Sequence, residues 1–189
     1  DFFKSMREFS TLINRLMETD DPEIIHATRV ACRRFEERLA VFFPKPRTGK
    51  IRKLRRKLRR IRGLLGGWRN CDVLLKLLTR ESAADENPAT QDAWKLVHNY
   101  VAERRSREIR RSRKKIEKYD QSALGEAIEK IVESPSGQDH PELLARVHAA
   151  QSAMRQKWLA ALTQAEQSLA PTDIHRFRIT TKRFRYRTE

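Results

Sequence analysis

Residues 23–38 read EIIHATRVACRRFEER, and residues 173–187 read DIHRFRITTKRFRYR. The second stretch repeats the pattern of the first at an offset of 149 positions, in its flanking apolar residues as well as in its charges. The matched cationic residues are His26, Arg29, Arg33 and Arg34 in the first copy and His175, Arg178, Lys182 and Arg183 in the second. An internal repeat dictates architecture. Because packing alone does not require the charges to repeat, the pattern indicates a functional site as well as a fold.

Apolar residues recur at helical spacing through most of the chain, beginning with Phe2, Met6, Phe9, Ile13 and Leu16. No strand-like alternation extends beyond a few residues, and Pro and Asp interrupt the pattern where helices should end. The predicted helices cover residues 2–18, 22–43, 51–81, 91–118, 123–132, 141–169 and 173–187, with Asp21 capping the second and Thr172 or Asp173 the last. The predicted connections cover residues 45–50, 82–90 and 134–140. Val97 and Leu144 have the spacing of core-facing residues on the helices at 91–118 and 141–169.

The repeat divides this single helical domain in two. We predict an all-α protein built from two antiparallel bundles of the four-helix type, related by a pseudo-two-fold axis. Repeat one covers about residues 1–120 and repeat two about residues 121–189 of one domain spanning residues 1–189. No counterpart of the helix at 51–81 follows the second copy, so we expect the second bundle to be incomplete and the chain to be trimmed at one or both ends.

The helix predicted at residues 51–81 has a basic face. Its apolar seam is formed by Ile51, Leu54, Leu58, Ile61 and Leu65, at alternating spacings of three and four. Three glycines, at positions 63, 66 and 67, predict a close backbone approach or a bend. The cations that border the seam are Arg52, Arg55, Arg59, Arg62 and Arg69. Lys53 and Arg60 lie farther from the seam and are expected to face solvent.

The charge of the chain indicates an anionic partner. The formal net charge is +16, from 41 Lys and Arg against 25 Asp and Glu. A folded protein with this excess gains from neutralisation by a polyanion: nucleic acid, an anionic membrane or an inorganic phosphate polymer. No apolar run approaches the roughly 20 residues of a membrane-spanning helix. Two cysteines without a metal-binding spacing favour a reducing compartment.

The repeated residues are suited to binding a repeated anion. At about 100° per residue, His26, Arg29 and Arg33 form one stripe on their helix. Two such stripes around a common cleft would present guanidinium forks and compact ammonium charges to successive phosphates. Enzyme motifs such as a glycine-rich phosphate loop or H-E-x-x-H are missing from the sequence. A metal site at His26 and His175 is disfavoured by the neighbouring cations. The basic run at residues 104–115 fits a solvated face at least as well as a binding face.

The chain resembles the CHAD family, the conserved histidine α-helical domain. The resemblance rests on residues 24–42 (IIHATRVACRRFEERLAVF), on residues 64–75 (LLGGWRNCDVLL) and on the second copy of the repeat. It implies two pseudo-symmetric four-helix bundles, a central basic groove and binding of inorganic polyphosphate. It also implies that the eight repeated cations contact the polymer, supported by Arg69 and the face from Arg52 to Arg62. One departure is Asn70, where the family has Asp after the Arg, although Asp72 remains.

Taken with the resemblance, the sequence predicts a cytoplasmic protein that binds polyphosphate without catalysis, metal or cofactor. The resemblance also implies an association with polyphosphate granules. A helical nucleic-acid-binding protein is the first alternative, and a phosphohistidine or metal site at His26 or His175 is the second. The scarcity of aromatic residues in the basic stretches counts against nucleic acid. The sequence leaves the oligomeric state and the preferred polymer length open.

Overall fold

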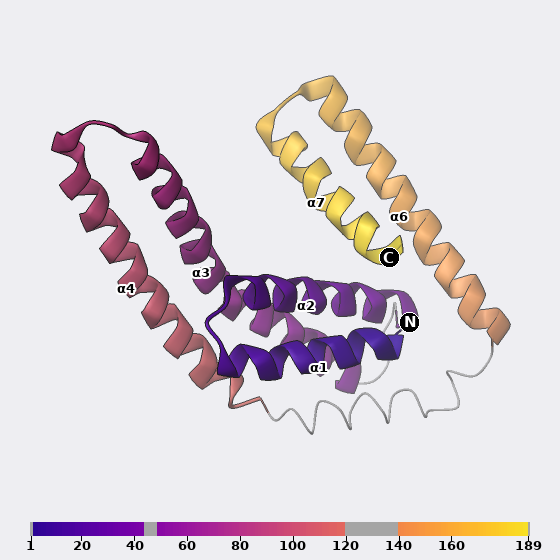
Figure 1. The fold of residues 1–189 in the computed structure, drawn as a ribbon. Helices are drawn as coiled ribbons and strands as arrows, with labels where there is room; N and C mark the ends of the chain where they lie inside the picture. The colour runs from indigo at the N-terminus through magenta and orange to yellow at the C-terminus, as the bar shows by residue number, and fades with distance from the viewer. Residues whose placement is uncertain (1, 44–48, 120–139, 189) are drawn as a thin grey trace. The chain divides into compact units, whose positions relative to one another are not determined.

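The computed structural model describes residues 2–43, 49–119 and 140–188 and is helical throughout these residues, apart from short connections (Figure 1). The elements are α1 (Phe2–Glu18), α2 (Pro22–Phe42), α3 (Gly49–Ala84), the 3₁₀ helix η1 (Pro88–Thr90), α4 (Gln91–Ile116), α6 (His140–Ser168) and α7 (Pro171–Thr188). No strand occurs in these ranges, which confirms the all-α prediction. The predicted helix at 123–132 and most of the predicted linker lie outside the described residues.

Helix boundaries follow local capping chemistry. The Asp21 carboxylate accepts a hydrogen bond from the backbone N–H of Glu23 at 2.8 Å, as predicted for the start of α2. The predicted cap of the last helix is wrong, because α7 begins at Pro171. Proline suits a first helical position, where its missing N–H costs nothing. The Asp173 carboxylate instead accepts a hydrogen bond from Ser168 Oγ at 2.7 Å and ties α7 to the end of α6.

Three connections differ from their predicted limits. α3 continues through Ala84, so the predicted loop at 82–90 shortens to residues 85–87 followed by η1. The Asp85 carboxylate organises this turn by accepting hydrogen bonds from Thr90 Oγ1 at 2.6 Å and Trp94 Nε1 at 2.7 Å. α3 already begins at Gly49, inside the predicted loop at 45–50, and α6 already begins at residue 140, the last position of the predicted linker.

The chain forms two compact units from interleaved segments. Unit 1 comprises residues 1–5, 33–56 and 122–189, and unit 2 comprises residues 6–32 and 57–121. Helices α2 and α3 each contribute residues to both units. One division between the units falls at residues 121–122, near the boundary that the repeat predicts, but unit 1 also takes residues 1–5 and 33–56 from repeat one. The two repeat-related bundles therefore stay a prediction.

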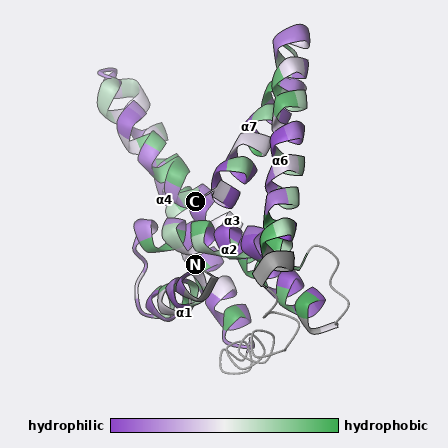
Figure 2. Cartoon of the chain, turned by 90° about the vertical axis from the view of Figure 1, so that its right-hand side faces the viewer, coloured by the Kyte–Doolittle hydropathy of each residue, from purple (hydrophilic) through white to green (hydrophobic). Residues whose placement is uncertain are grey.

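Unit 2 has an apolar core, to which α1, α2, α3 and α4 contribute buried residues. Figure 2 shows hydrophobic and hydrophilic residues alternating along the helices, the pattern of amphipathic helices with one buried face. The polar Thr28 is fully buried, and its hydroxyl is satisfied because Oγ1 donates a hydrogen bond to the Ile24 carbonyl at 2.7 Å. The buried core residues include Phe9, Ile13, Leu16, Ile25, Leu58, Ile61, Leu65, Trp68, Val101, Ile109 and Ile116.

Unit 1 contains the α6–α7 hairpin (Figure 1). The Trp158 ring stacks on Phe184 with a centroid distance of 5.5 Å, and its Nε1 donates to Thr181 Oγ1 at 3.0 Å. Met154 is buried, but Leu144 is 54% exposed, so its predicted packing is wrong. α7 has 18 residues against 29 in α6 and runs back from the carboxyl end of α6, so it ends before reaching Leu144.

The three glycines of α3 have different surroundings. A Cβ on Gly67 would lie 2.6 Å from Glu108 Oε2, and one on Gly66 would lie 3.4 Å from Arg29 Nη1. These two positions fit the predicted close approach, whereas a Cβ on Gly63 would meet nothing within 4 Å. The predicted bend stays a prediction.

The substitution Gly63→Ala should stabilise the protein by about 0.5–1 kcal/mol, because alanine reduces the backbone entropy lost in a helix interior. Urea denaturation would measure this gain. Gly67→Ala is the matched comparison and should gain less, because its methyl group must displace the Glu108 carboxylate. Destabilisation by Gly63→Ala would show that the helix needs glycine there for a bend.

Candidate functional site

The first copy of the repeat lies on α2, as predicted, with its cations unequally exposed. His26 is exposed, whereas Arg29, Arg33 and Arg34 are half-buried. Arg29 Nη1 donates to the backbone carbonyl of Arg62 at 2.7 Å. This charge-assisted hydrogen bond joins α2 to α3 close to Gly66, so Arg29 helps to hold the helices together.

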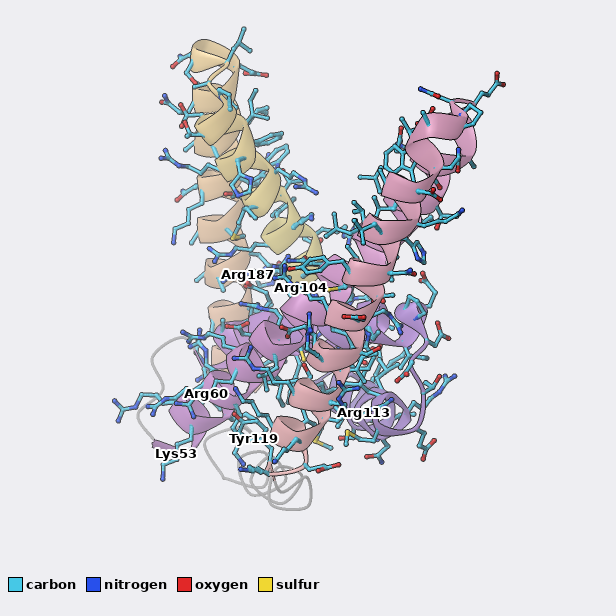
Figure 3. All side chains as sticks on the ribbon, turned by 90° about the vertical axis from the view of Figure 1, so that its left-hand side faces the viewer. Lys53, Arg60, Arg104, Arg113, Tyr119 and Arg187 are labelled. Atoms are coloured by element: carbon cyan, nitrogen blue, oxygen red, sulfur yellow. The ribbon has the colours of Figure 1, made fainter. Side chains whose placement is uncertain are left out.

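The basic face of α3 is also divided. Arg52 and Arg59 are exposed, whereas Arg55, Arg62 and Arg69 are half-buried. Nε of Arg55 is buried and has no hydrogen-bond partner among the described residues. Arg69 Nη1 approaches the Pro22 carbonyl at 3.5 Å, at the start of α2. Figure 3 shows Lys53 and Arg60 extending outward from α3, which agrees with the prediction that they face solvent.

The second copy of the repeat lies on α7. His175, Arg178 and Arg183 are exposed, and Lys182 is half-buried. A carboxylate that the sequence did not assign to this region, Glu37 of α2, accepts a hydrogen bond from Arg187 Nε at 2.8 Å and lies 3.8 Å from Arg183 Nε. Glu37 therefore offsets part of the positive charge at the end of α7.

A buried aromatic residue joins the two repeat helices within unit 1. The Arg33 guanidinium lies over the Tyr186 ring, 5.7 Å from its centroid, and Tyr186 itself is buried. A cation–π contact of this kind is stronger when the guanidinium is desolvated than when it is exposed. Arg33 thus contributes to packing in addition to its predicted role as an anion contact.

The two copies occupy different environments despite their matching sequences. Ile25 is fully buried in unit 2, whereas its counterpart Ile174 is 48% exposed. Arg29 donates to a carbonyl of α3, whereas Arg178 has no hydrogen bond or ion pair within the described part of the chain. The second copy therefore has the more accessible cations.

The predicted site residues fall into two groups. His26, Arg29, Arg59, Arg62 and Arg69 belong to unit 2, and the other predicted contacts belong to unit 1. The predicted groove between the two copies therefore stays a prediction. Within each unit, exposed cations do line the predicted helices.

The basic run of α4 separates into structural and exposed residues, which the sequence alone did not distinguish. Arg113 donates to the carbonyls of Leu16 at 3.2 Å and Thr19 at 2.9 Å and pairs with the Asp20 carboxylate at 2.7 Å. It thereby caps the carboxyl end of α1. The labelled Arg113 side chain can be seen at this position, beside α1, in Figure 3.

Arg105 pairs with the buried Asp72 at 2.7 Å and also donates to the Asp20 carbonyl. Burial raises the pKa of Asp72, and the hydrogen bond and charge of Arg105 partly oppose that shift. Oδ2 of Asp72 is buried without a hydrogen-bond partner among the described residues. Helical phase could have identified Arg105 as core-facing, because its position lies midway between the buried Val101 and Ile109.

The other cations of this basic run face outward. They are Arg104, Arg107, Arg110, Arg111, Lys114 and Lys115, all exposed. Val97 of the same helix was predicted to pack in the core, but it is 44% exposed and the prediction is wrong. At about 100° per residue, its position falls about 80° from the middle of the buried line through Val101 and Ile109.

No helix among residues 2–43, 49–119 and 140–188 is long and apolar enough to cross a membrane. In the same ranges no three side chains of His, Cys, Asp or Glu come together as a metal site.

Comparison with known proteins identifies the family of the chain. No curated protein and no solved structure matches the chain. The model of the CHAD domain matches residues 4–189, nearly the whole sequence. The chain carrying these repeated cationic helices therefore belongs to the CHAD domain family.

Proposed function

We propose that this CHAD domain binds inorganic polyphosphate through the exposed and half-buried cations of α2, α3 and α7, without catalysing a reaction on it. The family is associated with polyphosphate binding in general terms. The observation that carries the proposal for this chain is the duplicated cationic pattern on two helices, with His26, His175 and Arg178 exposed. The proposed location is the cytoplasm, at polyphosphate granules.

Binding would proceed by replacing counterions with protein cations. Polyphosphate carries a negative charge on each successive unit, and arginine can donate two parallel hydrogen bonds to phosphate oxygens. Arg52, Arg59 and Arg178 are exposed enough to do this from the surface. Neutral histidine donates from one ring nitrogen and the protonated form from both. A row of such contacts favours a long polymer over a single phosphate ion.

Competition at fixed ionic strength tests the proposal. The full chain would be loaded with fluorescent long-chain polyphosphate and challenged with unlabelled long polyphosphate, short polyphosphate or duplex DNA at equal phosphate concentration. Long polyphosphate should displace the probe best. If DNA displaces it equally well, the chain is a general polyanion binder and the proposal fails. Acid-labile phosphate on His26 or His175 would instead indicate a phosphohistidine carrier.

Two matched substitutions separate binding from packing. Arg178→Gln should weaken polyphosphate binding and reduce its salt slope by about 1, as expected for one phosphate contact, without loss of stability. Arg29→Gln should also lower the free energy of unfolding by about 1.5–3 kcal/mol, because it breaks the hydrogen bond to the Arg62 carbonyl. Titration and urea denaturation of both variants would measure these effects. Unchanged affinity in Arg178→Gln would remove α7 from the binding surface.

A further inference from the structure

The side of α4 that faces away from the core has two chemically different halves. At about 100° per residue, Leu96, Tyr100, Arg107, Arg111 and Lys114 fall within an arc of roughly 60°. The buried residues of α4 lie on the opposite side of the helix. Val97 and Arg104 border this arc, and together these seven residues define the outer face of α4.

The first half of the outer face is apolar. Leu96 is 73% exposed, Tyr100 58% and Val97 44%, although all three lie on a well-formed helix. Isolated exposed apolar residues are ordinary, but a contiguous group on one face marks an interaction surface. The exposed apolar group is therefore the first observation that indicates a partner.

The second half is cationic, and its charge is largely uncompensated. Arg111 lies 3.8 Å from the Glu108 carboxylate on the same helix. Arg104, Arg107 and Lys114 have no ion-pair partner within the described residues. Glu103 lies about 20° outside the arc and Glu117 about 60° outside it. Several exposed cations in line attract a ligand with several negative charges.

An apolar half followed by a cationic half on the same helix face disfavours two classes of partner, phosphate polymers and membranes. A phosphate polymer gains nothing from Leu96, Val97 and Tyr100, because it has no apolar groups. An interfacial membrane helix has its apolar and basic residues on opposite faces. In α4 they follow one another along the axis. The exposed acidic residues Glu86 and Asp92 near the apolar end would also be repelled by anionic lipid.

We propose that the outer face of α4 docks an amphipathic helix of a partner protein, acidic in its amino-terminal half and apolar in its carboxyl-terminal half. Such a helix lies antiparallel to α4, so its acidic half meets Arg104, Arg107, Arg111 and Lys114. Acidic residues near a helix amino terminus, and basic residues near a carboxyl terminus, complement the helix dipoles. The interface extends about 27 Å along α4, from Leu96 to Lys114, at 1.5 Å per residue.

The test uses the full chain and two synthetic helical peptides of about 24 residues, long enough to cover the face. In the first peptide, Glu side chains occupy one face of the amino-terminal half and Leu side chains the same face of the carboxyl-terminal half. The second has the same composition with Glu and Leu dispersed around the helix. Fluorescence anisotropy should show the ordered peptide binding at least about tenfold more tightly, since only it presents both halves in line.

Binding of the ordered peptide should require both halves of the outer face of α4. Two double variants test this. The apolar variant is Leu96→Ser with Tyr100→Ser, and the cationic variant is Arg107→Gln with Lys114→Gln. Each should weaken binding of the ordered peptide by about tenfold or more. The matched control is Lys157→Gln with Leu159→Ser on α6, which changes an exposed cation and an exposed apolar residue elsewhere. This control should bind the peptide like the unmodified chain.

Three results would overturn the proposal. The first is equal binding of the two peptides, and the second is full binding by the Leu96→Ser/Tyr100→Ser variant. The third is binding of that face to phosphatidylglycerol vesicles with the same dependence on Leu96 and Tyr100, which would assign it to a membrane. The apolar variant should keep its polyphosphate affinity within about twofold, because no charge changes. Failure of the docking proposal is therefore distinguishable from failure of the polyphosphate proposal.

Discussion

Binding of long-chain polyphosphate should weaken by a factor of about 10³–10⁵ between roughly 50 and 200 mM salt, the range expected for six to ten phosphate contacts. The reason is counterion release, since each protein cation that replaces a bound counterion makes association less favourable as salt rises. The predicted contacts supply enough cations on α2, α3 and α7, with Arg52, Arg59, Arg178 and Arg183 exposed. A titration at four or more salt concentrations would give the slope.

Matched charge variants would show which cations produce that slope. Arg52→Gln with Arg59→Gln should reduce the slope by about 2, one unit for each lost contact. Arg110→Gln with Lys115→Gln removes the same number of exposed charges from α4, outside the predicted site, and should leave the slope nearly unchanged. Equal reductions in the two variants would mean that polyphosphate senses only the net charge. A slope of two or less in the unmodified chain would contradict a multi-contact site.

Arg105→Met should lower the free energy of unfolding by about 3–5 kcal/mol at neutral pH, since removing one partner of a buried ion pair leaves an uncompensated charge. The Asp72 side chain is buried, and Arg105 supplies its hydrogen bond at 2.7 Å. Burial is the largest cause of the raised Asp72 pKa, and loss of Arg105 removes what opposes it. Urea denaturation across a range of pH would measure the effect.

The sign of the pH dependence follows from the raised pKa. A carboxyl with a raised folded-state pKa contributes stability below its unfolded pKa of about 3.9, and that contribution is lost as pH rises through the folded value. Losing Arg105 should raise the pKa of Asp72 further. The destabilisation by Arg105→Met, measured against the unmodified chain, should therefore be largest at neutral pH and shrink on acidification.

Two comparison variants make this prediction specific. Arg104→Met changes the neighbouring, exposed arginine and should alter stability by less than about 0.5 kcal/mol. Asp72→Leu with Arg105→Met removes both charges, so it should recover most of the stability lost in the single variant. A pH-independent loss in Arg105→Met would indicate that its packing and its hydrogen bond to the Asp20 carbonyl matter more than the ion pair.

Local sequence patterns were sufficient to predict most helices. The α1 and α2 boundaries agree closely because apolar periodicity, Asp21 and Pro22 act within a few residues of one another. The start of α7 was misplaced because Pro171 is compatible both with breaking one helix and with beginning the next. Val97 and Leu144 were misassigned because periodicity gives a candidate face but cannot say how far a neighbouring helix covers it.

Sequence also predicted which residues form the basic stripes, but it could not separate binding cations from structural ones. The repeat identified His26 and His175, and the structure leaves both exposed. The repeat makes Arg29 and Arg178 equivalent in sequence, yet only Arg29 is anchored to a backbone carbonyl of α3. The acidic neighbour of α7, Glu37, is 150 positions from Arg187 and carries no local signal of that pairing.

By itself, the sequence determined the helical content, the duplicated cationic pattern and the large positive charge, because each depends on residue identity and short-range spacing. Only the tertiary structure decided that Arg105 and Arg113 are structural while Arg104 and Arg107 face outward. The physical reason is that a guanidinium becomes structural when helix packing brings a carboxylate or an unpaired carbonyl within hydrogen-bonding distance. For Arg105 and Arg113 those partners, Asp72 and Leu16, lie 33 and 97 positions away in the chain.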